Sequence, residues 1–129
     1  MKTKLAAAAM GLFLVPLAAF AHHSFASQFD SNKPITVRGT VAKLEWTNPH
    51  SWLYVDTKDE SGKVVQWRCE LVSPNQLKRR GLTINSIKAG DQVIIEGSRA
   101  REGAFVGQPN TCHARAVKTG EGKPLIGDE

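Results

Sequence analysis

Residues 64–81, VVQWRCELVSPNQLKRRG, join a strand pattern to a short helix pattern and decide which fold class the chain adopts. In the first half of this stretch every second residue is apolar, which is typical of a half-buried β-strand. Ser73, Pro74 and Gln76 then provide a capping serine, a first-turn proline and a capping-box partner, which together signal the start of a helix. Gly81 ends the helix after little more than one turn. The stretch therefore predicts a strand followed by a short helix.

Further strand patterns lie on both sides of this stretch. Two strands are predicted upstream, separated by an Asn-Pro turn signal, and two more downstream; they cover residues 35–46, 52–57, 93–95 and 112–118. Three strands, a short helix and two strands form the element order of an OB-type barrel. We therefore predict an all-β fold with small α content, an OB-like five-stranded barrel with one short helix between strands 3 and 4.

The first 21 residues have the three parts of a secretory signal peptide. Lys2 and Lys4 supply the charged start, residues 5–17 form an apolar run, and residues 19–21 are a small-x-small cleavage site. An uncleaved membrane anchor is the alternative, but the apolar run is too short to span a bilayer comfortably. We therefore expect residues 1–21 to be cleaved, and the mature protein to be periplasmic or secreted from a bacterium.

The mature chain is small and only mildly basic. The full sequence has 129 residues and a formal net charge of +5; without the signal peptide, 108 residues and a charge of +3 remain. This length suits a single domain, which we divide into a polar N-terminal arm (22–33), the OB-like β-barrel domain (34–119) and a flexible tail (120–129). A charge of +3 is weak for phosphate binding, so we expect no nucleic-acid partner. After signal cleavage we expect no stable membrane insertion, because no remaining segment is apolar enough.

Cys69 and Cys112 are the only cysteines in the chain. In the oxidising compartment that export implies, a single pair of cysteines is expected to form a disulfide. The bond would close a loop of a little over 40 residues, and the chain-entropy model rates such a closure at about 4 kcal/mol. A metal-binding or redox-active thiol pair is the alternative, but the sequence lacks the CxxC spacing typical of both. We therefore predict a disulfide between the two.

Four histidines, together with one carboxylate, are candidate ligands for copper or zinc. Signal cleavage would give His22 a free α-amine beside its ring, and these two nitrogens can chelate one metal ion, with His23 adding a third. Nitrogen-rich sites of this kind favour Cu(II), with Zn(II) and Ni(II) behind. His50 and His113 could converge with Glu70, because the loops between strands 1–2 and 4–5 flank the binding face of an OB barrel. The alternative is a solvated N-terminus and ordinary turn or surface histidines.

Aromatic side chains supply a second candidate site. Trp46 and Trp67 alternate with apolar residues, so we expect both in the core. Trp52 and Tyr54 alternate with aliphatic residues, and either the aromatic or the aliphatic side chains must face outward. If the aromatic pair faces outward, it forms a stacking face for a small molecule or a peptide, as on strands 2 and 3 of OB barrels.

Several short motifs occur along the mature chain in one order: AHHSF (21–25), EWTNPH (45–50), WxxE (67–70), SPxxLxRxG (73–81) and GDxV (90–93). In this combination the chain resembles a family of small exported bacterial proteins, family 6152 of the domains of unknown function. The resemblance covers nearly the whole mature chain. It implies a secreted, single-domain, β-rich protein, and it implies no activity, substrate or catalytic residue.

No feature of the sequence selects a catalytic mechanism. The serines beside histidines lack a nucleophile elbow, no glycine-rich phosphate loop is present, and spacing selects no pair among the glutamates. We therefore expect no enzyme and no catalytic residues, but an exported binding or accessory module. The first hypothesis for its ligand is copper or zinc at the histidines. The alternatives are a small molecule or peptide on the aromatic face, or an envelope protein for which the chain is a structural partner.

Overall fold

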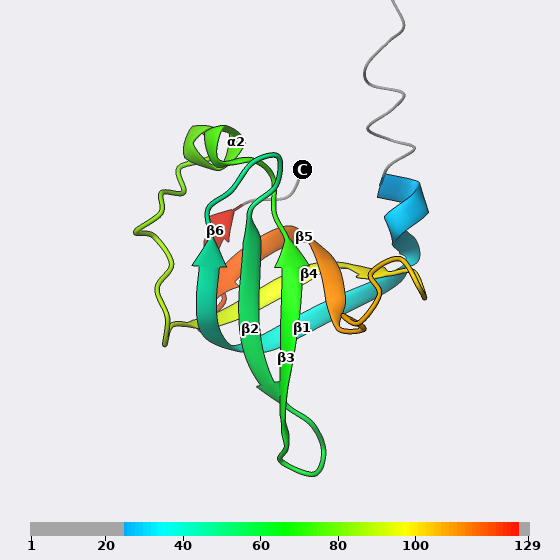
Figure 1. The fold of residues 1–129 in the computed structure, drawn as a ribbon. Helices are drawn as coiled ribbons and strands as arrows, with labels where there is room; N and C mark the ends of the chain where they lie inside the picture. Colours follow the sequence, from blue (N-terminus) through cyan, green and yellow to red (C-terminus); the bar gives the residue numbers. More distant parts are fainter. Residues whose placement is uncertain (1–24, 127–129) are drawn as a thin grey trace, which may run out of the picture.

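The computed structural model describes residues 25–126, which form six strands and two short helices (Figure 1). Residues 25–28 are helical and lead directly into the first strand. The other elements follow in the order β1 (Phe29–Glu45), β2 (Trp52–Lys58), β3 (Val64–Glu70), α2 (Pro74–Arg79), β4 (Gln92–Ala100), β5 (Thr111–Thr119) and β6 (Pro124–Ile126). The predicted series of three strands, a helix and two strands is confirmed, and β6 is an additional strand.

The strands form one mostly antiparallel sheet in the order β3-β2-β1-β4-β5-β6. A parallel pairing of β3 with β5 closes the first five of these strands into a ring. The pairing is only three residues long and places Cys69 opposite Cys112. The fold is therefore a closed ring of antiparallel strands with a single parallel contact.

Strand β1 belongs to both halves of the ring, because it pairs with β4 through its first part and with β2 through its second. Where the two pairings meet, Gly39 lies so close to β2 that a Cβ atom there would be 2.2 Å from the Asp56 carbonyl oxygen. The register then shifts between Val41 and Lys43, which is the irregularity of a β-bulge. The bend that the sequence suggests at Gly39 is thus a close approach of the strands followed by a bulge.

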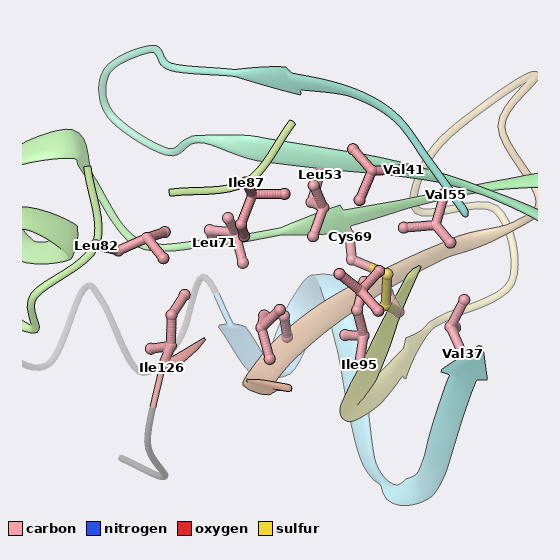
Figure 2. Close-up of a cluster of buried hydrophobic side chains, with 14 of the residues drawn as sticks. Val37, Val41, Leu53, Val55, Cys69, Leu71, Leu82, Ile87, Ile95 and Ile126 are labelled. Atoms are coloured by element: carbon pink, nitrogen blue, oxygen red, sulfur yellow. A yellow bond between two sulfur atoms is a disulfide. The ribbon is translucent and has the colours of Figure 1, made fainter. Parts of the chain in front are cut away.

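One apolar cluster fills the inside of the ring (Figure 2). Its members come from every strand and from the segment between α2 and β4; they include Val37, Leu53, Leu71, Leu82, Ile87, Ile95 and Ile126. Each fully buried side chain of this kind contributes about 1.5–3 kcal/mol to folding. Trp46 and Trp67 pack against the cluster and are partly buried, in agreement with their predicted place at the core.

The predicted disulfide between Cys69 and Cys112 is confirmed. Both residues are fully buried within the apolar cluster, as Figure 2 shows for the sulfur–sulfur bond. Because they are opposite each other in the β3–β5 pairing, the disulfide joins the two strands that close the ring. The covalent bond therefore reinforces the shortest pairing of the ring.

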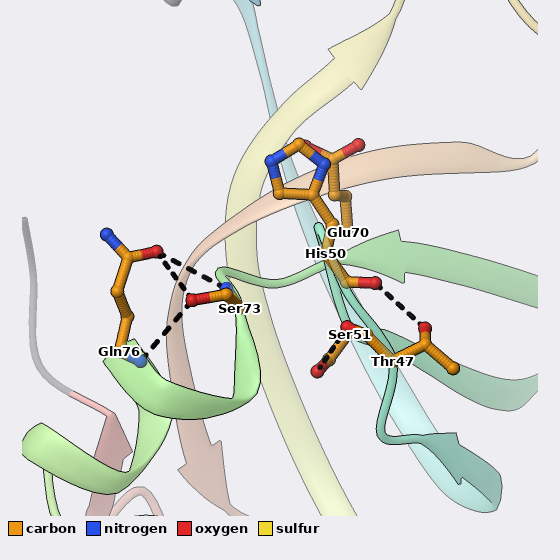
Figure 3. Close-up of polar contacts among 6 residues, drawn as sticks. All are labelled: Thr47, His50, Ser51, Glu70, Ser73 and Gln76. Atoms are coloured by element: carbon orange, nitrogen blue, oxygen red, sulfur yellow. Dashed lines mark hydrogen bonds and ion pairs between the residues drawn. The ribbon is translucent and has the colours of Figure 1, made fainter.

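Helix α2 begins at the predicted capping box. The Ser73 hydroxyl accepts a hydrogen bond from the Gln76 backbone N–H at 3.4 Å, and Gln76 Oε1 accepts one from the Ser73 N–H at 3.3 Å (Figure 3). Leu77 is fully buried and fixes the helix on the core. Gly81 has a φ of +86°, a left-handed conformation that favours glycine and ends the helix.

The N-terminal boundary of the folded domain differs from the prediction. Residues 29–33, expected in a polar arm, belong to β1, and Phe29 is only 1% exposed. The Phe29 ring contacts those of Phe25 and Phe105. This aromatic cluster joins residues from distant parts of the sequence, so no local pattern reveals it.

The C-terminal boundary differs as well. Pro124–Ile126, expected in a flexible tail, pairs with β5 as β6 and buries Ile126. The signal peptide, expected over 1–21, lies outside the described residues. Between residues 25 and 126, no helix is long and apolar enough to cross a membrane.

We predict that replacing both cysteines by alanine lowers the free energy of unfolding by about 2–5 kcal/mol. The disulfide joins residues 43 positions apart and so restricts the unfolded chain strongly, and the variant loses this restriction. Urea unfolding followed by tryptophan fluorescence measures this loss. Adding a thiol reductant to the wild-type protein should reproduce most of the loss and should not change the double variant. An unchanged urea midpoint in the reduced wild type would contradict the prediction.

Candidate functional site

The outer face of β2 and β3 carries the residues that the sequence singles out as a stacking face. Leu53 and Val55 are fully buried in the core, so the alternation of the strand places Trp52 and Tyr54 on the outside. In the pairing of β2 with β3, Trp52 is opposite Glu70 and Tyr54 is opposite Arg68. The choice that the sequence leaves open is therefore resolved in favour of an outward aromatic pair.

Arg68 lies over the Trp52 ring at this face and also near the Phe105 ring. Its guanidinium carbon lies 3.8 Å from the centre of the Trp52 ring and 5.5 Å from that of Phe105. The two rings meet edge to face, with their centres 6.0 Å apart. Cation–π contacts of this kind are worth about 0.5–2 kcal/mol each. Trp52 thus holds Arg68 in place.

A pocket of about 230 Å³ lies next to Arg68. It is lined by Tyr54, Gln66, Arg68 and residues 107–110 of the β4–β5 connection. The backbone N–H of Arg68 donates a 3.0 Å hydrogen bond to the Asn110 carbonyl oxygen, which ties the end of this connection to β3. Tyr54 is therefore a lining residue of the pocket, whereas Trp52 supports the lining from outside.

Tyr54 is fixed at the edge of the pocket by Glu45 and Lys43. Its hydroxyl donates a 3.2 Å hydrogen bond to Glu45 Oε2, and Lys43 Nζ lies 4.3 Å from the ring centre. Lys43 Nζ also donates to Glu45 Oε1 at 2.8 Å. This hydrogen bond is the main reason why the pKa of Glu45 is lowered and that of Lys43 raised. Both charges are therefore retained over the usual pH range.

His50 and Glu70 approach each other on the other side of Trp52. His50 Nδ1 lies 3.6 Å from Glu70 Oε1, and Figure 3 shows the two side chains together. The Glu70 residue is only 7% exposed. Burial raises its pKa above the ordinary value of 4.5, and the nearby charges of His50 and Arg68 offset part of this rise. The carboxyl group therefore keeps its proton to a higher pH than an ordinary glutamate does.

The backbone of His113 lies beside that of Glu70, because the two residues are opposite each other in the β3–β5 pairing. Its ring packs edge-on against Phe25, with centres 5.0 Å apart, and contacts Phe29 at 5.4 Å. Of the expected convergence of His50, Glu70 and His113, the contact between His50 and Glu70 is observed. Between residues 25 and 126, no group of three His, Cys, Asp or Glu side chains is arranged to hold a metal ion.

The remaining candidate ligands of the predicted metal site, His22 and His23, lie outside the described residues.

Two residues of the pocket region were not anticipated from the sequence. Arg68 sits on the polar side of the third strand, and Phe105 lies in a glycine-containing connection, where an isolated aromatic carries no pattern. The exact register of the β2–β3 hairpin places Arg68 opposite Tyr54, and this register is the signal that would have identified Arg68.

A comparison with protein-family models gives one match. The model described as "Family of unknown function (DUF6152)" matches residues 11–109, more than three quarters of the chain. This range contains β1 to β4 and the whole pocket lining apart from its last residue, Asn110. No curated protein matches the chain.

We predict that the stability contributed by Glu70 falls as the pH rises. Because its pKa is higher in the folded than in the unfolded state, the folded protein binds the proton more tightly, and this stabilisation is lost as the pH rises through the folded pKa. Relative to wild type, a Glu70→Gln variant should therefore gain stability between about pH 4 and about pH 7. Urea unfolding at both pH values measures the difference.

Glu60→Gln, at an exposed turn, is the matched control and should show no such pH-dependent gain. If Glu70→Gln loses stability relative to wild type over the same range, burial does not dominate the pKa of Glu70. A carbon NMR titration of the Glu70 carboxyl provides the direct measurement, with a midpoint expected above 4.5.

Proposed function

The chain belongs to this family of unknown function, and from that premise we propose that it is an exported, non-catalytic binding module for a small organic molecule. The ligand occupies the pocket between Tyr54, Arg68 and residues 107–110. One observation carries this proposal: a pocket of about 230 Å³ on the outer face of β2 and β3, lined by an aromatic ring, a stacked guanidinium and amide groups.

The arrangement of the strands supports an OB-type barrel as the scaffold. Five strands close into a ring, and α2 lies between β3 and β4. In OB barrels the outer side of strands 2 and 3 binds ligands, and the loops between strands 1–2 and 4–5 flank it. Here the corresponding loops contain His50 and residues 107–110. This correspondence supports the pocket as the ligand site of the module.

The chemistry of the lining supports binding rather than catalysis. Tyr54, Gln66, Gln108 and Asn110 offer a phenol ring and three amides, which recognise ligands by stacking and hydrogen bonds. Arg68 adds a positive charge that orients a ligand. Stacking and hydrogen bonding by these groups are the means by which small-molecule sites hold and orient a ligand.

Export is supported by the disulfide and by the predicted signal peptide. A buried disulfide such as Cys69–Cys112 is typical of proteins in oxidising compartments. The pattern of residues 1–21 favours secretion into the periplasm or beyond. Together they favour a module that meets its ligand outside the cytoplasm.

Copper or zinc binding is the second candidate function. His50 and Glu70 already lie within 3.6 Å, and Phe25 packs against His113, the backbone neighbour of Glu70. Cleavage after residue 21 would place the α-amine and ring of His22 three residues before Phe25, within about 10 Å of chain length. The N-terminal chelate would then be tethered near these side chains. The contact between His50 and Glu70 is the observation that favours the metal.

We predict that small organic molecules perturb the ¹⁵N–¹H NMR amide signals of the pocket lining: Tyr54, Gln66, Arg68, Gly107, Gln108 and Asn110. A panel of aromatic and aliphatic acids, amides and simple sugars is the probe. Tyr54→Ala should weaken the binding of a hit about tenfold or more, because the ring forms one wall of the pocket.

Ile84→Ala, at an exposed site remote from the pocket, is the control and should not change the affinity. Tyr54→Phe retains the ring and loses only its hydrogen bond to Glu45, so most of the affinity should remain. Shifts that gather elsewhere on the surface, or an unchanged affinity in Tyr54→Ala, would argue against this pocket.

We predict that protein beginning at His22 binds one Cu(II) ion, and that one extra residue before His22 weakens this binding at least tenfold. The extra residue removes the free amine from the chelate. Isothermal titration with Cu(II) compares the two forms. Equal affinities in the two titrations would rule out the N-terminal chelate. His50→Ala should weaken binding only if the loop supplies a further ligand.

A further inference from the structure

We propose that the pocket beside Tyr54 binds a small organic carboxylate, with the Arg68 guanidinium as the partner of the carboxylate group. The inference rests on the proposed function, because it names the chemical class of ligand for the same pocket. It follows from the hydrogen-bonding state of Arg68, from the charges around it and from the size of the pocket.

Within residues 25–126, the Arg68 side chain makes no hydrogen bond, and its Nε is buried without a partner. A guanidinium carries five N–H donors in a planar fork, and a buried donor without a partner is destabilising. The Trp52 ring, 3.8 Å away, fixes the plane of the fork. Arg68 is therefore held by stacking while its donors are unused, and a carboxylate accepting two of them would complete the site.

The carboxyl groups near Arg68 do not take this role. Glu45 influences Arg68 only at a distance, because its two oxygens accept hydrogen bonds from Lys43 at 2.8 Å and Tyr54 at 3.2 Å. Glu70 is paired with His50 at 3.6 Å, and burial raises the pKa of its carboxyl group. The positive charge of Arg68 is therefore not cancelled by a contacting anion of the protein.

The rest of the pocket lining is neutral. Gln66, Gln108 and Asn110 contribute amides, and Gln66 Nε2 donates to Asp56 Oδ1 at 2.9 Å, which directs Asp56 toward the amide. One cation in a neutral lining matches a ligand with one negative charge. The amides can bond the polar remainder of such a ligand.

A second hollow lies on the other side of residues 108–109; its lining is richer in cations and also contains the carboxylate of Glu102. Arg101 contacts Asp30 at 3.6 Å and donates a 2.7 Å hydrogen bond from Nε to the Ala26 carbonyl. Arg99 stacks over the Trp67 ring at 5.1 Å. Among the described residues, the buried Nε without a hydrogen-bond partner is what distinguishes Arg68 from these two arginines.

The size of the pocket limits the ligand. Its volume of about 230 Å³ is below the range of roughly 300–1,000 Å³ that is usual for drug-sized ligands. A compact acid fits better than an extended chain. A free small acid is therefore the expected source of the carboxylate, in preference to the C-terminus of a polypeptide.

The test compares small carboxylic acids with their primary amides, for example benzoate with benzamide and butanoate with butanamide, in a panel of such pairs. Each compound is titrated into ¹⁵N-labelled mature protein at neutral pH. We expect the acids to bind at least tenfold more tightly than the matched amides, with shifts centred on Arg68, Gly107, Gln108 and Asn110. Peptides with a free or an amidated C-terminus are added as separate arms and should bind more weakly than the free acids.

Substitutions at Arg68 separate charge from packing. Arg68→Met keeps an unbranched apolar side chain without the guanidinium and should lower acid binding at least tenfold, with little effect on the amides. Arg68→Lys retains the charge without the planar fork and should recover only part of the acid binding. Arg79→Met, at an exposed position of α2, is the matched control and should bind like wild type.

Amides that bind as well as their acids would overturn the carboxylate inference and leave the proposed binding function standing. A panel in which no compound perturbs the pocket would overturn both. Free-terminus peptides that bind more tightly than every small acid would overturn the assignment to a small acid. These comparisons use the wild-type protein, so they hold even if Arg68→Met fails to fold.

Discussion

The short parallel pairing of β3 with β5 is the contact on which the rest of the structure depends. It spans only three register pairs, yet it converts a row of strands into a closed ring. The Cys69–Cys112 disulfide lies inside it and compensates for the small number of hydrogen bonds that so short a pairing provides. The same pairing sets Arg68 opposite Thr111 and brings the Asn110 carbonyl within 3.0 Å of the Arg68 N–H. The strand pairing that closes the ring therefore also positions one side of the pocket.

Close approaches between backbones let so small a ring close. A Cβ atom on Gly97 would lie 1.8 Å from the His113 carbonyl oxygen, and one on Gly39 would lie 2.2 Å from that of Asp56. In both places one strand crosses against its neighbour with no room for a side chain, and a register shift follows or coincides. The glycines are therefore required by the curvature of the sheet, which a strand pattern alone does not reveal.

Local patterns in the sequence predict the elements well, and contacts across the ring explain what they miss. The capping box at Ser73 and the disulfide depend on neighbouring residues or on a single possible pair. The sequence pattern places Phe29 in a polar arm, because aromatic residues that it contacts in the structure are distant in sequence. The role of Arg68 could not be foreseen, since alternation shows that it faces outward but gives neither its register opposite Tyr54 nor the Phe105 ring above it.

The neighbouring charges explain why one face can offer a positive site although acidic residues surround it. Glu45 is engaged by Lys43, which lowers its pKa and confines its charge to that pair. Burial has the opposite effect on Glu70 and raises its pKa. The Glu70 carboxyl group therefore competes less with a ligand for Arg68 than an exposed carboxylate would. Pairing removes one acid from competition and burial weakens the other. The stacked guanidinium then remains the charge that an incoming molecule meets in the pocket.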